Sequence, residues 1–155
     1  MKVLVYAPHN DDEVLGVGGT MAKLVAEGHE VYVCEVTRSS NQEDVDRHRG
    51  EAEKAHRILG VKGTFFLDLP VVHLKNCPVG ELNKKFLDIT KEISPDVAFI
   101  PHKGDMHIDH YEVAQAAMVA LRPVELPGLK AIYAYETLSE KHGSACPDRC
   151  APYGV

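Results

Sequence analysis

Two clusters of histidine and acidic residues are the parts of this sequence best suited to chemistry. The first is His9–Glu13 (HNDDE), and the second, much later in the chain, is His107–His110 (HIDH). His9 and Asp12 stand three residues apart, so one turn of chain can aim an imidazole and a carboxylate at the same point. With His110 as a third ligand, the clusters predict a site of two histidines and one carboxylate, which is typical of a catalytic metal with an open position for water.

The metal and the remaining polar residues can be given roles in such a site. Zinc is the first choice, and the same ligand set also serves Fe²⁺, so the residues indicate a divalent transition metal without selecting the element. Asp11 cannot easily share the metal with its neighbour, because adjacent side chains diverge, and it is our candidate general base. His107 is a candidate to stabilise an oxyanion or protonate a leaving nitrogen, and Asp109 to orient an imidazole. Together these residues predict a metal-assisted hydrolase.

The acidic residues also have a simpler interpretation. Asp11, Asp12 and Glu13 stand where a helix is expected to begin, and acidic side chains stabilise helix N-termini without any catalytic role. Recurrence favours the metal site, because both clusters follow an expected strand and precede an expected helix. Histidines outside these two loops lie in no such cluster and are interpreted as structural: His29, His48, His56, His73 and His142.

The glycines of residues 16–19 (GVGG) invite comparison with the phosphate-binding turn of dinucleotide-binding folds. A GxGxxG pattern that began at Gly16 would need glycine at Met21, and acidic residues stand where a pyrophosphate would bind. We therefore interpret the glycines as allowing close packing of the first helix or leaving room beside a substrate, and we expect no nucleotide cofactor.

The elements that must position these clusters alternate between strand and helix. Arg38 to Asp46 is expected to be a loop, and the helix after it is expected to bury Ala52, Ala55, Ile58 and Leu59 before Gly60 ends it. Apolar runs predict strands at 2–7, 30–37, 64–69, 97–100 and 131–135, and helical spacing predicts helices at 14–27, 52–59, 82–93 and 111–121. This order predicts an α/β fold, a Rossmann-like three-layer sandwich with a mostly parallel central sheet, in which ligands bind at the carboxyl ends of the strands.

Length, charge and apolar content limit the domain organisation and the classes of partner. A chain of 155 residues is the size of one domain, so residues 1–155 are expected to form a single unit. The formal net charge of −6 leaves no basic surface for nucleic acid, and no apolar run approaches the ~20 residues of a membrane span. Pro8 and the acidic residues after it interrupt any signal peptide, which predicts a cytoplasmic protein with reduced thiols. Cys146 and Cys150 do not have the spacing of a structural zinc site.

The two motifs resemble those of the PIG-L/LmbE-like family of metal-dependent de-N-acetylases, whose first motif is usually HPDDE and whose second is HxDH. Glu51–Gly60 and Tyr135–Thr137 are also similar to family features, so the resemblance runs from Met1 to about Ser139. The resemblance implies zinc bound by His9, Asp12 and His110. It also implies that Asp11 is the general base and that His107 stabilises charge or acts as a general acid.

The resemblance also implies a substrate. Members of this family remove acetyl groups from N-acetylglucosamine units, so a small glycoconjugate is expected, and Arg47 or Arg49 is a candidate to hold it unless both are simply solvated. Relatives often self-associate, which suggests a homo-oligomer. Asn10 replaces the usual proline, and the chain ends at Val155, earlier than family members do, so it is expected to lack their C-terminal segment. The alternatives are a non-catalytic metal- or sugar-binding module and a metal-dependent hydrolase of another amide or ester.

Overall fold

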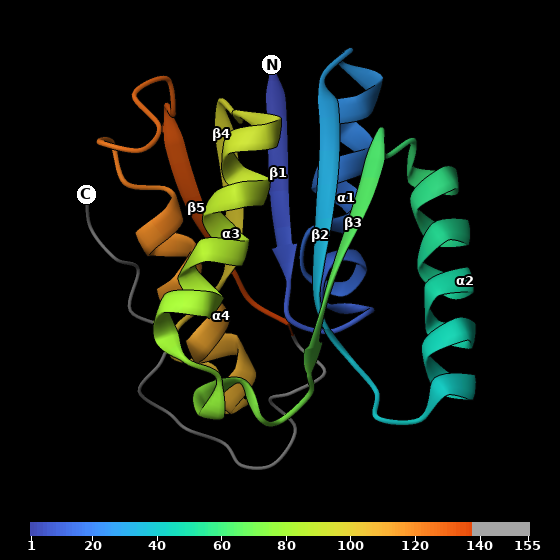
Figure 1. The fold of residues 1–155 in the computed structure, drawn as a ribbon. Helices are drawn as coiled ribbons and strands as arrows, with labels where there is room; N and C mark the ends of the chain where they lie inside the picture. The colour runs from blue at the N-terminus through green and yellow to red at the C-terminus, as the bar shows by residue number, and fades with distance from the viewer. Residues whose placement is uncertain (138–155) are drawn as a thin grey trace, which may run out of the picture.

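The computed structural model describes residues 1–137, which form a central sheet between two layers of helices (Figure 1). The strand order is β3-β2-β1-β4-β5, and every pair of neighbouring strands is parallel. The strands are β1 (Lys2–Ala7), β2 (Glu30–Arg38), β3 (Gly63–Pro70), β4 (Val97–Pro101) and β5 (Ala131–Tyr135). The predicted α/β sandwich is confirmed.

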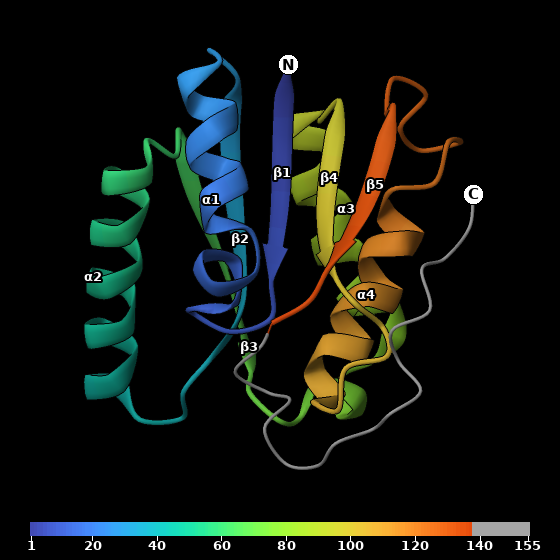
Figure 2. The same cartoon turned by 180° about the vertical axis from the view of Figure 1, so that it is seen from behind.

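The helices cover both faces of the sheet. They are α1 (Asp12–Ala26), α2 (Gln42–Leu59), α3 (Val79–Ile93) and α4 (Ile108–Ala120), with a short 3-10 turn, η1 (Leu74–Asn76). Figure 1 shows α3 and α4 in front of the sheet, and Figure 2 shows α1 on the opposite face with α2 beside it. Side chains of β1 alternate between two cores: Leu4 and Tyr6 pack on the α3 and α4 side, whereas Val3 and Val5 pack on the α1 side. This two-sided burial explains why the strand is apolar throughout.

The second helix ends at Leu59 before Gly60, as the sequence predicts, but its start and its buried face differ from the prediction. It begins at Gln42, inside the segment expected to be a loop, because the Asn41 side chain caps it by accepting a hydrogen bond from the Glu43 amide at 3.1 Å. Ile58, expected on the inner face, is 87% exposed. The buried position one turn before the end of the helix is taken by His56, a residue that hydrophobic patterning could not identify as internal.

The sheet order determines where the two motifs meet. The chain builds outward from β1 through β2 to β3 and then returns to add β4 on the other side of β1, so that Val3 pairs with Val97 and Val5 with Phe99. The carboxyl ends of β1 and β4 therefore lie side by side. Parallel α/β sheets bind ligands at such a switch point, and here the loop of residues 8–11 meets that of residues 102–107.

Two further expectations can be compared with the described residues. Cys34 is buried and Cys77 is partly exposed, and both are free thiols, whereas Cys146 and Cys150 lie outside residues 1–137. Within the described part of the chain, no helix is both long and apolar enough to cross a membrane.

Gly16 allows α1 to pack closely against the end of the sheet. A Cβ atom at Gly16 would lie 2.4 Å from Cδ2 of the Tyr135 ring, whereas one at Gly19 would meet nothing within 4 Å. The ring is held in place because the Tyr135 hydroxyl donates a hydrogen bond to the Tyr6 carbonyl at 2.8 Å. The close-packing interpretation of this glycine agrees with the structure.

Gly16→Ala is therefore expected to lower the free energy of unfolding by about 1–3 kcal/mol, because the buried Tyr135 ring must move to admit the methyl group. Gly19→Ala, in the same helix, is the matched control. It is expected to raise stability by about 0.5–1 kcal/mol through its helix propensity. Urea unfolding followed by circular dichroism measures both, and a Gly16→Ala midpoint equal to that of the wild-type chain would contradict the packing role.

Candidate metal site and adjoining cavity

The carboxylate of Asp12 lies between the imidazoles of His9 and His110. Its Oδ2 atom is 3.1 Å from Nδ1 of His9 and 3.1 Å from Nε2 of His110, and these two nitrogens are 3.3 Å apart. A zinc ion with metal–ligand distances of about 2.0–2.1 Å and tetrahedral angles holds its ligand atoms about 3.3 Å apart. The three donor atoms therefore have the dimensions of one face of a zinc tetrahedron.

A second carboxylate orients each of the two imidazoles. Nε2 of His9 lies 3.4 Å from Oδ2 of Asp109, and Nδ1 of His110 lies 3.2 Å from Oδ2 of Asp105. Each distal nitrogen thus faces a carboxylate, and the nitrogen nearer Asp12 faces the candidate metal position, as is usual for metal-ligating histidines. The orienting role of Asp109 was expected from the sequence, whereas Asp105 was missed, because one aspartate in a polar loop carries no local signal.

Asp109 is itself held by the backbone of the segment after β3. The amide of Val72 donates a hydrogen bond to its Oδ2 at 2.6 Å, and Val72 has a φ of +64°. The left-handed region costs a non-glycine residue roughly 1–2 kcal/mol, and a β-branched side chain tolerates it poorly. Such strain is typical of functional sites, and here it accompanies an amide that donates to the carboxylate facing His9.

The charges in this group reinforce one another. Burial raises the pKa of Asp12, but hydrogen bonds from His110 and His9 lower it more, so the net pKa lies well below its usual value. Burial lowers the pKa of His9, but its hydrogen bonds to Asp109 and Asp12 outweigh this and raise the pKa to about 9. Burial also raises the pKa of Asp109, yet His9 and the Val72 amide lower it overall. A bound cation would take the place of the His9 proton, because a ligating imidazole is neutral.

Asp11 and His107 flank these three residues. Asp11 is the exposed residue before α1, and its side chain makes no capping hydrogen bond with the helix, so capping does not account for it. His107 is the N-cap of α4, where its Nδ1 accepts a hydrogen bond from the Asp109 amide at 3.2 Å. Its ring centroid lies 4.3 Å from that of His9, and ring nitrogens of His9, His107 and His110 lie within 4.8 Å of one another.

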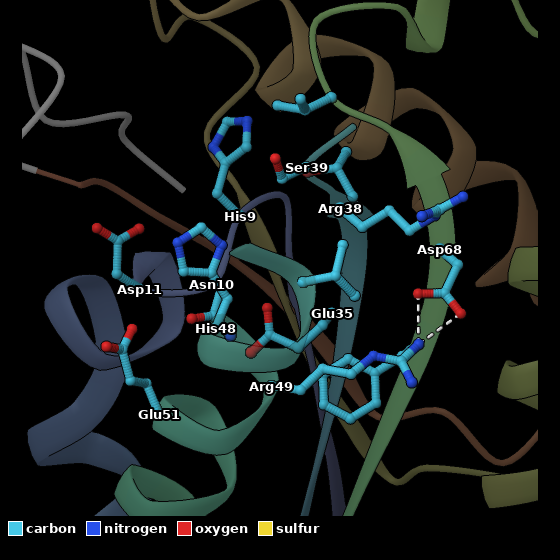
Figure 3. Close-up of a pocket in the computed structure, with 14 residues that line it drawn as sticks. His9, Asn10, Asp11, Glu35, Arg38, Ser39, His48, Arg49, Glu51 and Asp68 are labelled. Atoms are coloured by element: carbon cyan, nitrogen blue, oxygen red, sulfur yellow. Dashed lines mark hydrogen bonds and ion pairs between the residues drawn. The ribbon is translucent and has the colours of Figure 1, made fainter. Parts of the chain in front are cut away.

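A cavity of about 410 Å³ opens over the carboxyl ends of β1, β2 and β3 (Figure 3). His9 and Asp11 line one side, and Arg49 and Asp68 line the other. The Arg49 guanidinium donates to both oxygens of Asp68, at 2.5 and 2.6 Å, and lies 4.7 Å above the ring of Phe66. Of the two arginines that the sequence offers as substrate ligands, Arg49 lines the cavity and Arg47 does not.

A local irregularity of the chain brings Asp68 to the cavity, whereas Arg47, inside the regular helix α2, does not line it. The pairing of β2 with β3 shifts register between Glu35 and Thr37, beside Asp68, which has a φ of +54°. Bulges of this kind re-aim side chains next to active sites, and sequence patterning gave no sign of this one. Arg47 bonds Asp44, one turn earlier on α2, at 2.7 Å.

A second buried cluster includes the last residue of the first motif. Glu13, Glu35 and His56 are each at most 3% exposed, and each offers one ligand atom within 4.8 Å of the others. Burial, followed by repulsion from Glu13 and from Asp12, raises the pKa of Glu35 well above its usual value. No local pattern predicts this cluster, because its three members are far apart along the chain, and sequence alone makes His56 an isolated structural histidine.

Comparison with known proteins fixes the family. Residues 4–121 match PIG-L, the GlcNAc-PI de-N-acetylase family. The chain belongs to this family. The uncharacterized deacetylase YaiS of Escherichia coli K12 is 32% identical over 146 residues, which cover 88% of this chain and 74% of YaiS.

Solved structures agree with this PIG-L assignment. The conserved protein TT1542 of Thermus thermophilus is similar with a TM-score of 0.76 and 29% identity, over 92% of this chain and 68% of TT1542. The N,N'-diacetylchitobiose deacetylase of Pyrococcus horikoshii is similar with a TM-score of 0.71 and 29% identity, over 83% of this chain and 52% of that enzyme. The PIG-L chain described here thus spans about half the length of the diacetylchitobiose deacetylase.

The raised pKa of His9 predicts a pH-dependent stability for the chelator-treated protein. Because the pKa rises from 6.5 to about 9 on folding, protonated His9 stabilises the fold fully below pH 6.5, and this contribution is lost as the pH rises through 9. The loss is at most about 3.5 kcal/mol, from about 1.4 kcal/mol per pKa unit. The lowered pKa of Asp12 affects stability at acidic pH. The ionised Asp12 carboxylate stabilises the fold fully above pH 3.8, and this stabilisation is lost as the pH falls further.

His9→Gln is expected to flatten the decline in stability between about pH 6.5 and 9, because glutamine does not titrate. Urea unfolding of chelator-treated wild-type and variant chains over this range measures the two slopes. His29→Gln, which changes a half-buried histidine at the other end of the sheet, is the control and should keep the wild-type slope. Equal slopes for His9→Gln and the wild-type chain would contradict the assignment.

Proposed function

We propose that this chain is a metal-dependent de-N-acetylase that removes the acetyl group from an N-acetylglucosamine-containing glycoconjugate. The observation that carries the proposal is the 3.1–3.3 Å spacing of donor atoms from His9, Asp12 and His110, which would hold Zn²⁺ or, as a second choice, Fe²⁺. A metal bound by these residues would lower the pKa of a coordinated water and polarise the acetyl carbonyl. Membership of the PIG-L family supports amide hydrolysis.

Asp11 is the proposed general base. It lines the cavity beside His9, where its carboxylate can take a proton from the attacking water as the water oxygen bonds to the acetyl carbon. The same proton is then available to the nitrogen as the C–N bond breaks, so the products are acetate and a free amine. The exposure of Asp11 supports this role, since a base must be reached by both water and substrate.

His107 is proposed to stabilise the negative charge that forms on the carbonyl oxygen. Its Nδ1 accepts a hydrogen bond from the Asp109 amide, so the neutral ring carries its hydrogen on Nε2. An Nε2–H group beside His9 is suited to donate a hydrogen bond to the oxyanion. Asp109 acts as a positioning residue, because its carboxylate faces Nε2 of His9.

Arg49 and Asp68 are proposed to bind the sugar. The pair presents N–H donors and carboxylate acceptors side by side, which suits neighbouring sugar hydroxyls, and both residues line the cavity that reaches His9. A volume of about 410 Å³ falls within the range of small-molecule sites. The second candidate is a non-catalytic module that binds a metal or a sugar without turnover.

Two substitutions separate metal binding from catalysis. His110→Ala is expected to abolish both metal binding at this site and amine release, because one of three ligands is lost. Asp11→Asn is expected to keep that metal but to lower kcat by roughly 10²–10⁴-fold, the usual contribution of a general base. Metal analysis by mass spectrometry and amine release from diacetylchitobiose, before and after chelation and Zn²⁺ or Fe²⁺ restoration, measure the two properties.

Full activity in Asp11→Asn would overturn the assignment of the base. Metal binding with no amine release from any N-acetylated sugar would favour the binding module, and release of product from another amide or ester instead would favour a hydrolase of different specificity. Asp44→Asn, a change at a half-buried position on α2 outside the cavity, is the control and should keep wild-type turnover.

The proposed sugar contact is tested at Arg49. Arg49→Ala is expected to raise KM by about tenfold or more with a smaller change in kcat, because a charged hydrogen-bond donor to the substrate is lost while the metal ligands and Asp11 are untouched. Arg57→Ala, an exposed arginine at the far end of the same helix, should leave KM unchanged. Steady-state kinetics with diacetylchitobiose measure both, and equal KM values for the two variants would remove Arg49 from the binding site.

A further inference from the structure

Three ionisable side chains that the proposed reaction does not use meet in the interior beside the cavity. Glu13 comes from α1, Glu35 from β2 and His56 from α2, and they are 1%, 2% and 3% exposed. Nε2 of His56 lies 3.1 Å from Oε1 of Glu13 and 3.7 Å from Oε1 of Glu35. Glu35 also lines the cavity, so the cluster is adjacent to a route from solvent (Figure 3).

Three buried carboxylate oxygens in this cluster have no hydrogen-bond partner among the described residues. They are Oε2 of Glu13 and both oxygens of Glu35. An unsatisfied buried acceptor costs about 1–3 kcal/mol, and more when it is charged, so native proteins supply partners for nearly all of them. Three such oxygens around one point indicate a cluster built to hold a positively charged partner.

His56 pairs with only one of the carboxylate oxygens, because its Nε2 lies at hydrogen-bond distance from Oε1 of Glu13. Its Nδ1 lies 2.7 Å from the hydroxyl of Thr64 on β3, and this contact on the distal nitrogen turns Nε2 toward the two carboxylates. A polar group on the distal nitrogen is the usual support for a metal-ligating imidazole. One imidazole carries at most one positive charge, so the second carboxyl group of the cluster needs either a proton or a bound cation.

We propose that Glu13, Glu35 and His56 form a second divalent-cation site, separate from the site of His9 and its neighbours. Two carboxylates and one imidazole suit Zn²⁺ or Mn²⁺, and such a cation would contact all three segments at once. The bound cation would tie the start of α1 to β2 and α2 and so hold the first motif in position. The site does not depend on the proposed reaction, because none of its ligands contacts the substrate in that mechanism.

The experiment is a count of bound Zn²⁺ in variants that remove one site at a time. The wild-type chain, saturated with Zn²⁺ and desalted, is expected to hold two equivalents by mass spectrometry. His110→Ala should hold one, and His110→Ala combined with Glu35→Gln should hold none. Glu53→Gln, an exposed acid on α2, is the matched control and should keep two equivalents.

A stability measurement gives a second readout. Zn²⁺ is expected to raise the melting temperature of His110→Ala, because ligands of the folded state stabilise it, and Glu35→Gln should abolish that rise. If the wild-type chain holds a single equivalent that is lost completely in His110→Ala, the second site is overturned, and a trapped water or a shared proton occupies the cluster. That count needs no variant of the cluster to fold. Two equivalents without amine release would instead contradict the proposed function and leave the second site standing.

Discussion

The parallel pairing of β1 with β4 is the constraint on which the site depends. It joins residues that are distant in the sequence, so that His9 and His110, 101 positions apart, bring ring nitrogens to 3.3 Å. A slip of one residue in this pairing would turn the apolar side chains of β1 to the wrong face, which two buried cores forbid. The hydrophobic packing of the sheet therefore fixes the distance between polar groups that make no hydrophobic contact themselves.

The polar groups at this edge form one chain of alternating carboxylates and imidazoles. The order is Asp109, His9, Asp12, His110 and Asp105, and each neighbouring pair has side-chain atoms within 3.1–3.4 Å. The two ends are tied to the fold, the first by the Val72 amide and the last by the His107 amide and the Thr137 hydroxyl. Such a buried chain is stable only as a whole, because removal of one member leaves its neighbours without a compensating charge.

The sequence was sufficient where structure is decided locally and insufficient where it is decided by packing between distant segments. Strand and helix order followed from periodicity, and the places of His9 and His110, each just beyond the end of a strand, followed from the strand ends. The start of α2 was missed because the residues after Asn41 are polar and were expected to form a loop, whereas the Asn41 cap lets the helix begin at Gln42. The partners of His56 and the place of Asp68 were missed for a different reason, since each depends on contacts between elements that no local pattern encodes.

The three acids that begin α1 show how one short motif serves several environments. Successive helical residues are rotated by about 100°, so consecutive side chains must point in different directions. Asp11 is exposed beside the cavity, Asp12 turns to His9 and His110, and Glu13 is buried against His56. All three acids interact favourably with the positive end of the helix dipole. Exposed acids would do so equally well, so the dipole gives no reason to bury Asp12 and Glu13. Capping therefore does not explain why Asp12 and Glu13 are buried. The histidines that they contact, His9 and His110 for Asp12 and His56 for Glu13, explain it.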